Sequence, residues 1–279
     1  MSKRRDLETQ LRSLTEIKEI MNAMKNLSLM EVHRLNRFLN TQRRVVASIE
    51  AAAADFLGFY PELLAAEGEI RNVYLLVGSE RGFCGDFNEA LLRALDSHID
   101  SAGDVRLVAI GNKLVAKLSV DTRIAASLDG ASVVDEVDSV LVKLMDALTG
   151  LSAPGAVRAP LRLTVFHHDA TEGTIKVSDL SPFQKPESKT SHFAHAPLIF
   201  LQPQTFFAGL ADQYLFAALH ELLYSSLMAE NQLRMQHMDA AVRRLERRST
   251  ELLQKRNILR QEEITEEIEV IMLSVEALK

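Results

Sequence analysis

The sequence predicts an α/β protein in which a strand–helix domain is inserted between two long terminal helices that pair as two halves of one coiled coil. Three observations carry this prediction. Both ends of the chain lack glycine and proline, apolar residues near the C-terminus recur in heptads, and the middle alternates between short apolar runs and helical patterns.

The distribution of glycine and proline predicts the two helices. All seven prolines lie between Pro61 and Pro203, and all twelve glycines lie between Gly58 and Gly209. In a helix interior glycine costs about 1 kcal/mol relative to alanine, and proline about 3 kcal/mol. We therefore expect one helix over residues 1–60 and another over residues 204–279. With a rise of ~1.5 Å per residue they extend roughly 80 Å and 100 Å, so they should protrude from a small domain.

The apolar spacing predicts that these helices pack on each other. Near the C-terminus two interleaved sets of apolar residues follow a seven-residue repeat: Met238, Leu245, Leu252 and Leu259, with Met235 and Val242. Along the first helix apolar residues step by three or four: Leu7, Leu11, Leu14, Ile17, Met21, Met24 and Leu27. Such spacing is typical of a left-handed coiled coil. The alternative is a helical bundle, for which the chain offers no third long helix.

The segment 70–202 has the texture of an α/β domain. Short apolar runs at 72–77, 106–110 and 123–128 are each followed by a helical pattern, at 87–99, 113–118 and 133–148. This alternation predicts a mainly parallel sheet. Two further strands are expected at 161–167 and 174–180, joined by a hairpin turn at Thr171–Gly173. The polar run from Gln184 to His195 predicts a loop, and Pro197–Leu201 is expected to add a last strand.

Composition excludes several classes of protein. A net charge of −6 over 279 residues argues against a general nucleic-acid binder. No apolar run is long enough for a membrane span, and no signal peptide is expected. The single cysteine, Cys84, excludes an internal disulfide and fits a reducing compartment.

Charge is distributed unevenly along the C-terminal helix. Residues 234–260 hold eight Arg or Lys against three acidic residues, and residues 261–276 hold six glutamates and no base. Such asymmetry is found on partner-facing surfaces and, more commonly, on solvated helix faces.

The turn after the first strand is the best candidate for a nucleotide site. Gly78, Gly82 and Gly85 follow a strand and precede a helix, with a spacing one residue off the dinucleotide fingerprint. Backbone amides there could bind an anion. No acidic residue closes the next strand to hold a ribose, and the chain has no P-loop motif. A tight strand-to-helix turn is therefore the favoured interpretation.

Metal and nucleophile sites are also weakly supported. The histidine pairs His192/His195 and His167/His168 lack a third ligand, and the sequence after His220 and Glu221 lacks the second histidine of a zinc-protease motif. Cys84 lies in the turn at a predicted helix start, where its pKa could be lowered, but no base is placed beside it. We expect no catalytic residue, metal or cofactor.

Four stretches resemble one known family. They are IKEIMNAMKNLSLMEVHRL at Ile17–Leu35, GSERGFCGDFN at Gly78–Asn88, AENQLRM at Ala229–Met235 and NILRQEEITEEI at Asn257–Ile268. These are similar to the I-x-x-A-M-K, G-L-C-G-x-x-N, S-E-N-x-x-R-M and N-x-x-R-Q-x-x-I-T-x-E motifs of the γ subunit of F-type (F1Fo) ATP synthases. The match runs along nearly the whole chain.

The resemblance implies a fold and a role. It implies a Rossmann-like domain inserted between terminal helices that form an antiparallel coiled coil, the central stalk of the rotary complex. Its expected partners are the α and β subunits, the ε subunit and the ring of c subunits. The chain would couple rotation of that ring to the β subunits without being an enzyme itself. Its expected place is peripheral, on the cytoplasmic face of a bacterial or archaeal cell membrane.

The resemblance also assigns residues. Met24 and Lys25 match the position that faces the moving β lever, and a polar set matches the contacts to β near the upper part of the shaft: Arg260, Gln261, Thr265 and Glu267. The conserved turn of the family corresponds to Gly82, Cys84, Gly85 and Asn88. The apolar end, with Ile271, Met272, Leu273 and Val275, would sit in a bearing.

Several departures from the family pattern point to a divergent branch, such as an alternative F-type ATPase. Ala229 replaces a serine, Asp86 replaces a glycine, and the stretch VRRLERR at Val242–Arg248 stands where the family continues toward an N-A pair. Glu262 and Glu263 replace small residues. Two other readings stay open at this stage, a stand-alone α/β enzyme with a coiled-coil arm and a coiled-coil adaptor unrelated to ATPases.

Overall fold

The computed structural model describes residues 2–64, 71–99, 105–151, 161–180 and 195–276. The chain divides into two compact units. One comprises residues 1–28 with 235–279, and the other residues 29–234. We call them the helical unit and the α/β unit, and each is described by itself.

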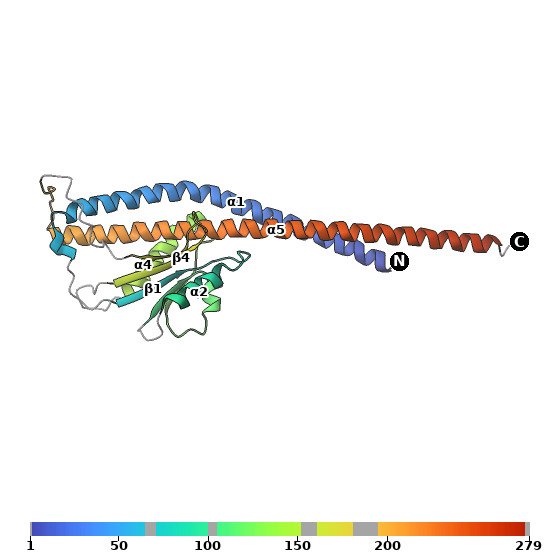
Figure 1. The fold of residues 1–279 in the computed structure, drawn as a ribbon, viewed down its shortest axis with the longest axis horizontal. Coiled ribbons are helices and arrows are strands. Elements are labelled where there is room, and N and C mark those ends of the chain that lie inside the picture. Colours follow the sequence, from blue (N-terminus) through green and yellow to red (C-terminus); the bar gives the residue numbers. More distant parts are fainter. Residues whose placement is uncertain (1, 65–70, 100–104, 152–160, 181–194, 277–279) are drawn as a thin grey trace. The chain divides into compact units, whose positions relative to one another are not determined.

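Two long helices contribute to both units. Helix α1 runs over Ser2–Leu57 and helix α5 over Pro203–Glu276 (Figure 1). Helix α1 stops where the first glycine of the chain appears, and the amide of Gly58 donates to the carbonyl of Ala54 at 3.1 Å. Proline at the first position of α5 costs nothing, because that amide has no partner within a helix. The two predicted terminal helices are therefore confirmed.

The α/β unit contains a five-stranded sheet. Its strands are β1 (Arg71–Val77), β2 (Arg106–Ile110), β3 (Ile124–Leu128), β4 (Leu161–His168) and β5 (Ile175–Asp179), in the order β3-β2-β1-β4-β5. Only β5 is antiparallel, paired with β4, and the other pairs are parallel. The order β3-β2-β1-β4 is that of Rossmann-like domains, as the resemblance implied.

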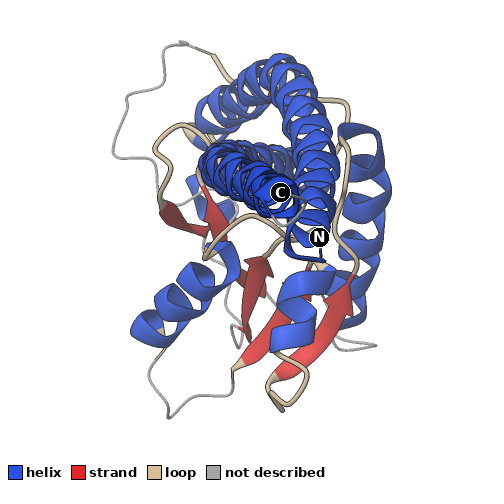
Figure 2. Cartoon of the chain, turned by 90° about the vertical axis from the view of Figure 1, so that its right-hand side faces the viewer, coloured by secondary structure: helices blue, strands red, loops and turns tan. Residues whose placement is uncertain are grey.

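Short helices connect the strands. They are α2 (Phe87–His98), α3 (Asn112–Lys117) and α4 (Val137–Leu151), with the 3-10 turns η1 (Pro61–Leu64) and η2 (Val134–Glu136). Figure 2 shows the strands with helices beside them. Side chains from the strands, from these helices and from α1 and α5 share one core, whose fully buried members include Leu35, Leu75, Phe87, Leu91, Leu144 and Phe166.

The β4–β5 hairpin has the predicted turn. The amide of Gly173 donates to the carbonyl of Asp169 at 2.9 Å, and Gly173 adopts a φ of +67°. The carboxylate of Asp169 accepts the amide of Thr171 at 2.7 Å, which closes the turn from its first residue. Glycine supplies the left-handed conformation at little steric cost.

The prediction of a last strand at 197–201 is wrong. These residues form no strand, and within the described ranges β5 pairs with β4 alone. Leu198 and Phe200 are almost fully exposed, so the apolar run does not face the core as a buried strand would. Proline at position 197 also lacks the amide that a sheet ladder needs. The predicted loop at 184–194 lies outside the described residues.

The helical unit is an antiparallel helix pair. Three ion pairs join α1 to α5: Lys25 to Asp239 at 2.7 Å, Lys18 to Glu246 at 3.6 Å and Arg4 to Glu263 at 3.1 Å. As the residue number falls along α1 it rises along α5, which defines opposite directions. On α5 the predicted heptad seam is confirmed, because Met238, Val242 and Leu252 are buried.

On α1 five residues of the predicted stripe are partly buried, and two are exposed; the five are Leu7, Leu11, Leu14, Met21 and Met24. Ile17 and Leu27 are 42% and 61% exposed, whereas Ser28 is buried. Lys18 and Lys25 are partly buried on the side of α1 that forms ion pairs with α5. The predicted stripe, which includes Ile17 and Leu27, and the observed seam, which includes Lys18 and Lys25, both advance by three or four residues along the helix. Lysine can occupy such a position because its aliphatic stem packs while the ammonium reaches a carboxylate.

Candidate functional site

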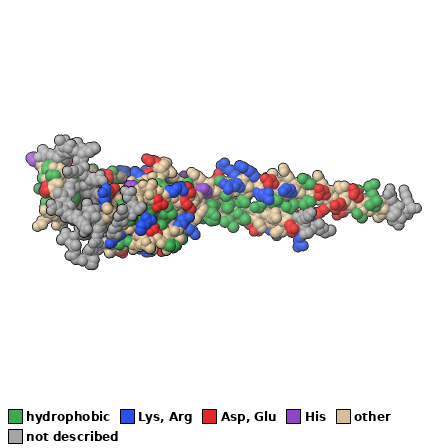
Figure 3. Space-filling view, turned by 60° about the horizontal axis from the view of Figure 1, so that its bottom comes forward, with side chains coloured by type: hydrophobic (Ala, Val, Ile, Leu, Met, Phe, Trp, Pro, Cys, Tyr) green, Lys and Arg blue, Asp and Glu red, His purple; other side chains and the backbone are tan. Residues whose placement is uncertain are grey.

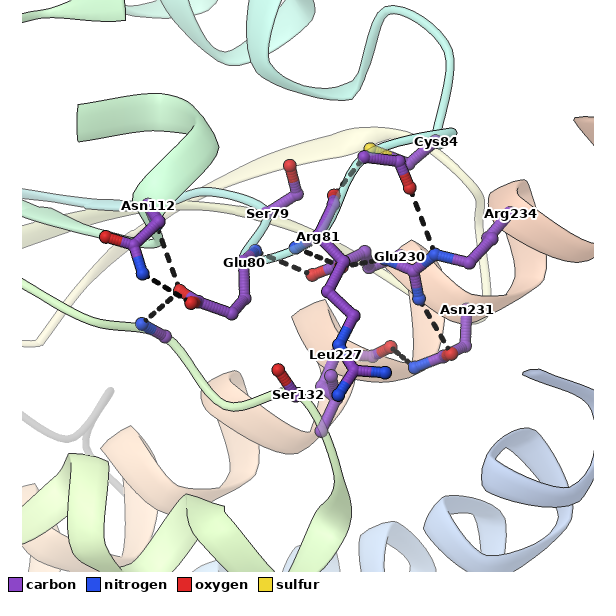
Figure 4. A network of polar contacts seen from close by, with 12 residues as sticks. Ser79, Glu80, Arg81, Cys84, Asn112, Ser132, Leu227, Glu230, Asn231 and Arg234 are labelled. Atoms are coloured by element: carbon purple, nitrogen blue, oxygen red, sulfur yellow. Dashed lines mark hydrogen bonds and ion pairs between the residues drawn. The ribbon is translucent and has the colours of Figure 1, made fainter. Parts of the chain in front are cut away.

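A network of polar contacts in the α/β unit joins α5 to the turn between β1 and α2 (Figure 4). We call it the clamp, and it comprises Ser79, Glu80, Arg81, Gly82, Cys84, Asn88, Asn112, Gly130, Glu230, Asn231 and Arg234. The turn contributes one side and the motif AENQLRM of α5 contributes the other. Two motifs separated by about half of the sequence thus meet at one place.

Glu230 and Arg234 form the centre of the clamp. They lie one turn apart on α5, are 3% and 5% exposed, and are joined by a short ion pair. The Glu230 carboxylate also accepts the amides of Glu80 at 3.3 Å and Arg81 at 3.2 Å. The Arg234 guanidinium donates to the carbonyl of Gly82 at 3.1 Å and to the side chain of Asn231 at 2.9 Å.

The four predicted turn residues all lie in the β1–α2 connection. Gly82 contributes the carbonyl that Arg234 binds, and Gly85 has a φ of +67°. The thiol of Cys84 is buried and donates to the carbonyl of Arg81 at 3.6 Å. Asn88 is buried at the start of α2, where its side chain accepts the Ser79 amide at 3.0 Å and donates to the Ser79 hydroxyl at 2.8 Å. Asn88 therefore fixes both ends of the turn.

Glu80 extends the network toward the next loops. Its carboxylate accepts the amides of Asn112 at 3.0 Å and Gly130 at 2.7 Å, and the Asn112 side chain at 2.5 Å. These amides follow the ends of β2 and β3, where a Rossmann-like sheet exposes backbone donors. A carboxylate of the chain itself already satisfies them, and its negative charge would repel a phosphate. The tight-turn interpretation of the glycine motif is therefore favoured over a nucleotide site.

Burial sets the protonation behaviour of the clamp. Desolvation raises the pKa of Glu230, while Arg234 acts in the opposite direction. Desolvation likewise raises the pKa of the Cys84 thiol, which favours the protonated form over the nucleophilic thiolate. The sequence argument that a helix start could lower this pKa is thus outweighed by burial.

The buried histidines have structural partners. His168 stacks on Phe87 with ring centroids 3.7 Å apart, and its Nε2 lies 2.9 Å from the Phe87 carbonyl. His167 contacts the His168 carbonyl at 3.2 Å and Ser178 at 3.3 Å. Among the residues that the structure describes, no three His, Cys, Asp or Glu side chains converge as metal ligands. His192 of the candidate pair lies outside the described residues.

The predicted shaft residues lie in the helical unit. Met24 is partly buried, and the ammonium of Lys25 is engaged by Asp239. Arg260, Gln261, Thr265 and Glu267 are all exposed on α5. The Thr265 hydroxyl donates to the Gln261 carbonyl at 2.9 Å, which is a contact within the helix. The structure therefore leaves these four side chains accessible to a partner.

Sequence reasoning missed the central clamp residues. Glu80, Glu230 and Arg234 were not singled out, although the motifs that contain them were. A signal was present, because Glu230 and Arg234 lie four apart in a stretch rich in leucine and methionine. A charge pair at that spacing within an apolar stretch predicts a buried ion pair.

The fold and the clamp define an α/β protein built on two long terminal helices, whose buried polar groups hold its own elements together. The chain belongs to the ATP synthase family, because the family model matches residues 3–278.

The chain is similar to ATP synthase gamma chains along nearly their whole length. The chain is 25% identical to the ATP synthase gamma chain of Heliobacterium modesticaldum, over 98% of each protein. It is 24% identical to that of Moorella thermoacetica and 22% identical to that of Campylobacter concisus, over 100% of each protein in both cases.

Solved structures show the same fold. A chain of the Euglena gracilis mitochondrial ATP synthase, in an assembly of OSCP, F1 and c-ring, superposes with a TM-score of 0.65. The alignment covers 99% of this chain and 95% of that one at 12% identity. A chain of the Tetrahymena thermophila central stalk and c-ring gives a TM-score of 0.56 at 15% identity, covering 80% and 99%. In the part of the chain that is described, no helix is long and apolar enough to cross a membrane.

Proposed function

We propose that the chain is the central rotor stalk (γ) subunit of an F1Fo ATP synthase. In this role it couples ion-driven rotation of the c-ring to conformational change in the catalytic β subunits. Its proposed partners are the α and β subunits, the ε subunit and the c-ring. The observation that carries the proposal is the exposed apolar end of α5, in a chain whose relatives are named ATP synthase gamma chain.

The end of α5 has apolar side chains on every side. Val270, Ile271, Met272 and Leu273 are 66%, 60%, 65% and 65% exposed. Successive helical residues are about 100° apart, so four in a row cover the whole circumference. A helix that is apolar all round is normally buried. The described residues leave this segment uncovered. We therefore propose that it is inserted into an apolar socket of a partner subunit.

The polar residues that precede this apolar end can contact different partner subunits in turn as the helix rotates. Arg260 and Glu267 lie seven residues apart and share one face, and Gln261 and Thr265 lie four apart on a neighbouring one. Arginine and glutamine side chains are directional donors, so they can engage successive partners. We propose that these residues contact β loops and that Met24 and Lys25 face the β lever.

The mechanism needs no reactive group in this chain. Rotation changes which side of an asymmetric helix pair faces each β subunit. Each orientation then stabilises one β conformation over the others by its differential contacts. The chain is therefore proposed to be non-catalytic and to act from the cytoplasmic face of the cell membrane. We propose that residues 1–60 and 204–279 are the shaft helices and that residues 70–202 are the Rossmann-like domain.

A reconstitution experiment tests the proposal. The tagged chain should co-purify with α and β in fixed stoichiometry, and the chain alone should hydrolyse no ATP. The double variant Val270→Asp/Ile271→Asp should abolish coupled ATP synthesis, since charges would enter an apolar socket. Val120→Asp, at a 91% exposed site of the α/β unit, is the matched control and should retain activity. Recovery of the wild-type chain without α or β would rule out the proposed role.

A further inference from the structure

A histidine of α5, His220, takes no part in the clamp or in the proposed function. Its side chain is 14% exposed, and its ring nitrogen Nε2 lies 3.0 Å from a carboxylate oxygen of Asp138, the second residue of α4. The two atoms are not aligned for a hydrogen bond, so the buried Nε2 has no hydrogen-bond partner among the described residues. This nitrogen therefore faces a carboxylate that it does not fully engage.

Aromatic side chains cover the rest of the ring. The His220 ring stacks on Tyr224 with centroids 4.4 Å apart, and Phe216 lies edge-on at 6.1 Å. Tyr224 in turn contacts Phe38 of α1, with centroids 5.8 Å apart. The face of an aromatic ring attracts a cation weakly, but it does not replace the water that a charged imidazole loses on burial.

The charged groups around His220 come from α4 and from two neighbouring ion pairs. Asp138 of α4 is the charged group that acts on the ring, and its side chain is 78% exposed. The two ion pairs join α1 to η2 and to α5: Arg34 with Asp135 at 2.9 Å and Arg43 with Glu221 at 3.3 Å. Figure 3 shows acidic and basic side chains intermingled over the α/β unit. Such a mixed surface does not impose a field of one sign on the ring.

Apolar side chains hold α4 and α5 together beside this histidine. Val137 and Val140 of α4 and Leu223 and Leu227 of α5 are buried, and they line one cavity of about 20 Å³. The contact of His220 with Asp138 joins the first turn of α4 to the same stretch of α5. Separation of the two helices would therefore bring the His220 ring into water.

The ring binds a proton less readily when the two helices are packed. Burial lowers the pKa of His220 below its ordinary value of 6.5, while Asp138 acts in the opposite direction. The mostly exposed Asp138 compensates only in part, because water screens its charge. Once the ring is in water its pKa returns to about 6.5. A proton therefore binds the separated helices in preference to the packed ones.

From this arrangement we propose that the His220–Asp138 contact makes the packing of α4 on α5 sensitive to pH. A neutral ring keeps the first turn of α4 packed on α5, and protonation of the ring releases it. Because the packed form has the lower pKa, the contact is fully stable above pH 6.5 and loses stability as the pH falls. One proton shifts the equilibrium by up to about tenfold per pH unit. This inference concerns the α/β unit alone and does not depend on the proposed function.

Hydrogen exchange of the α4 amides in the full chain tests the inference between pH 7 and pH 5, after correction for the intrinsic exchange rate. In the wild type the opening of α4 should increase toward about tenfold per pH unit below pH 6.5. In His220→Gln, which carries no titrating ring, this increase should be lost. In Asp138→Asn it should continue to a lower pH, because the group that raises the pKa of His220 is gone. Asp146→Asn, at an exposed position of α4, is the matched control and should behave as wild type.

Two further measurements separate His220 from the other histidines. His167 and His168 also bind protons as the pH falls, but they lie in β4, so the protection of α2, which contacts β4, measures their contribution in every protein. An equal dependence on pH of the α4 amides in the wild type and in His220→Gln would overturn the inference. Titration of the His220 ring by NMR needs no variant. A midpoint below pH 6.5 is expected, and a midpoint at or above 6.5 would contradict the proposal.

Discussion

The two units of this chain use charge in different ways. In the α/β unit the pair Glu230–Arg234 is 3% and 5% exposed and binds the backbone of the β1–α2 turn. In the helical unit the pair Lys25–Asp239 is 31% and 33% exposed and joins two helices at their surface. Buried pairs are costly to break, whereas exposed pairs contribute little.

The apolar residues follow the same division. The α/β unit encloses a continuous core that includes Leu75, Phe87 and Phe166. In the helical unit the apolar residues of the last turns, such as Ile271 and Leu273, are exposed. The comparison indicates that the α/β unit is stabilised by its own contacts, while the helical unit leaves apolar side chains exposed at the end of α5.

The largest expected effect is at the clamp. Arg234→Ala should lower the free energy of unfolding of the α/β unit by about 3–5 kcal/mol, because the buried Glu230 carboxylate loses its counter-charge. Urea denaturation of the purified chain measures this. The control is Arg93→Ala, which breaks the exposed pair with Asp86 at 2.8 Å and should cost under about 1 kcal/mol. Equal losses would erase the distinction between buried and exposed pairs.

The next largest effect is a dependence of the stability of the α/β unit on pH. Burial lowers the pKa of His167 from its ordinary value of 6.5 to about 4. The unfolded chain therefore binds a proton that the folded one does not, and stability is lost as the pH falls from 6.5 toward 4. The loss for this residue approaches about 3 kcal/mol. Burial lowers the pKa of His168 as well, which acts in the same direction.

Neighbouring charges modify this titration. The carboxylate of Asp169 raises the pKa of His167, and Lys176 and His168 lower it. Denaturation of the wild type and of His167→Gln between pH 7 and pH 4 is the measurement. The variant should show a shallower slope, and an unchanged slope would mean that His167 titrates normally in the folded protein.

A smaller effect is expected at the loop after β2. Gly111 has a φ of +103°, and a Cβ there would lie 2.7 Å from the carbonyl oxygens of Gly78 and Ser79. Gly111→Ala should destabilise the α/β unit by roughly 2 kcal/mol through backbone strain and this clash. Gly150→Ala is the control, since a Cβ there meets nothing within 4 Å and alanine favours the helix by about 1 kcal/mol. Thermal melting should shift in opposite directions for the two variants.

The smallest effect is expected at the exposed ion pair between Lys25 and Asp239 in the helical unit. Lys25→Ala should cost under about 1 kcal/mol, and the loss should shrink further at high salt, because the pair with Asp239 is solvent-accessible. The hydrogen bond from Lys25 lowers the pKa of Asp239, and Arg243 acts in the same direction. Hydrogen exchange of the helical unit would detect the change. A loss as large as that of Arg234→Ala would show that the helix pair depends on this contact.

Local sequence predicted most of the elements and the turn. Long stretches without glycine or proline gave α1 and α5, and apolar runs gave the five strands of the sheet. The glycine spacing located the β1–α2 turn, including Gly85 with its φ of +67°. The sequence did not show that the Glu80 carboxylate accepts hydrogen bonds from the backbone amides after β2 and β3, because these contacts join three separate loops.

By itself the sequence determined the two long helices, the five strands of the sheet and which face of α5 is apolar, since backbone cost and heptad spacing are local properties. Only the tertiary structure decided that α1 turns Lys18 and Lys25, and not Ile17 and Leu27, toward α5. It also decided that Glu230 and Arg234 bind the turn that follows β1. The physical reason is that pairing between distant segments depends on which partner is across the interface, and spacing along one segment does not contain that information.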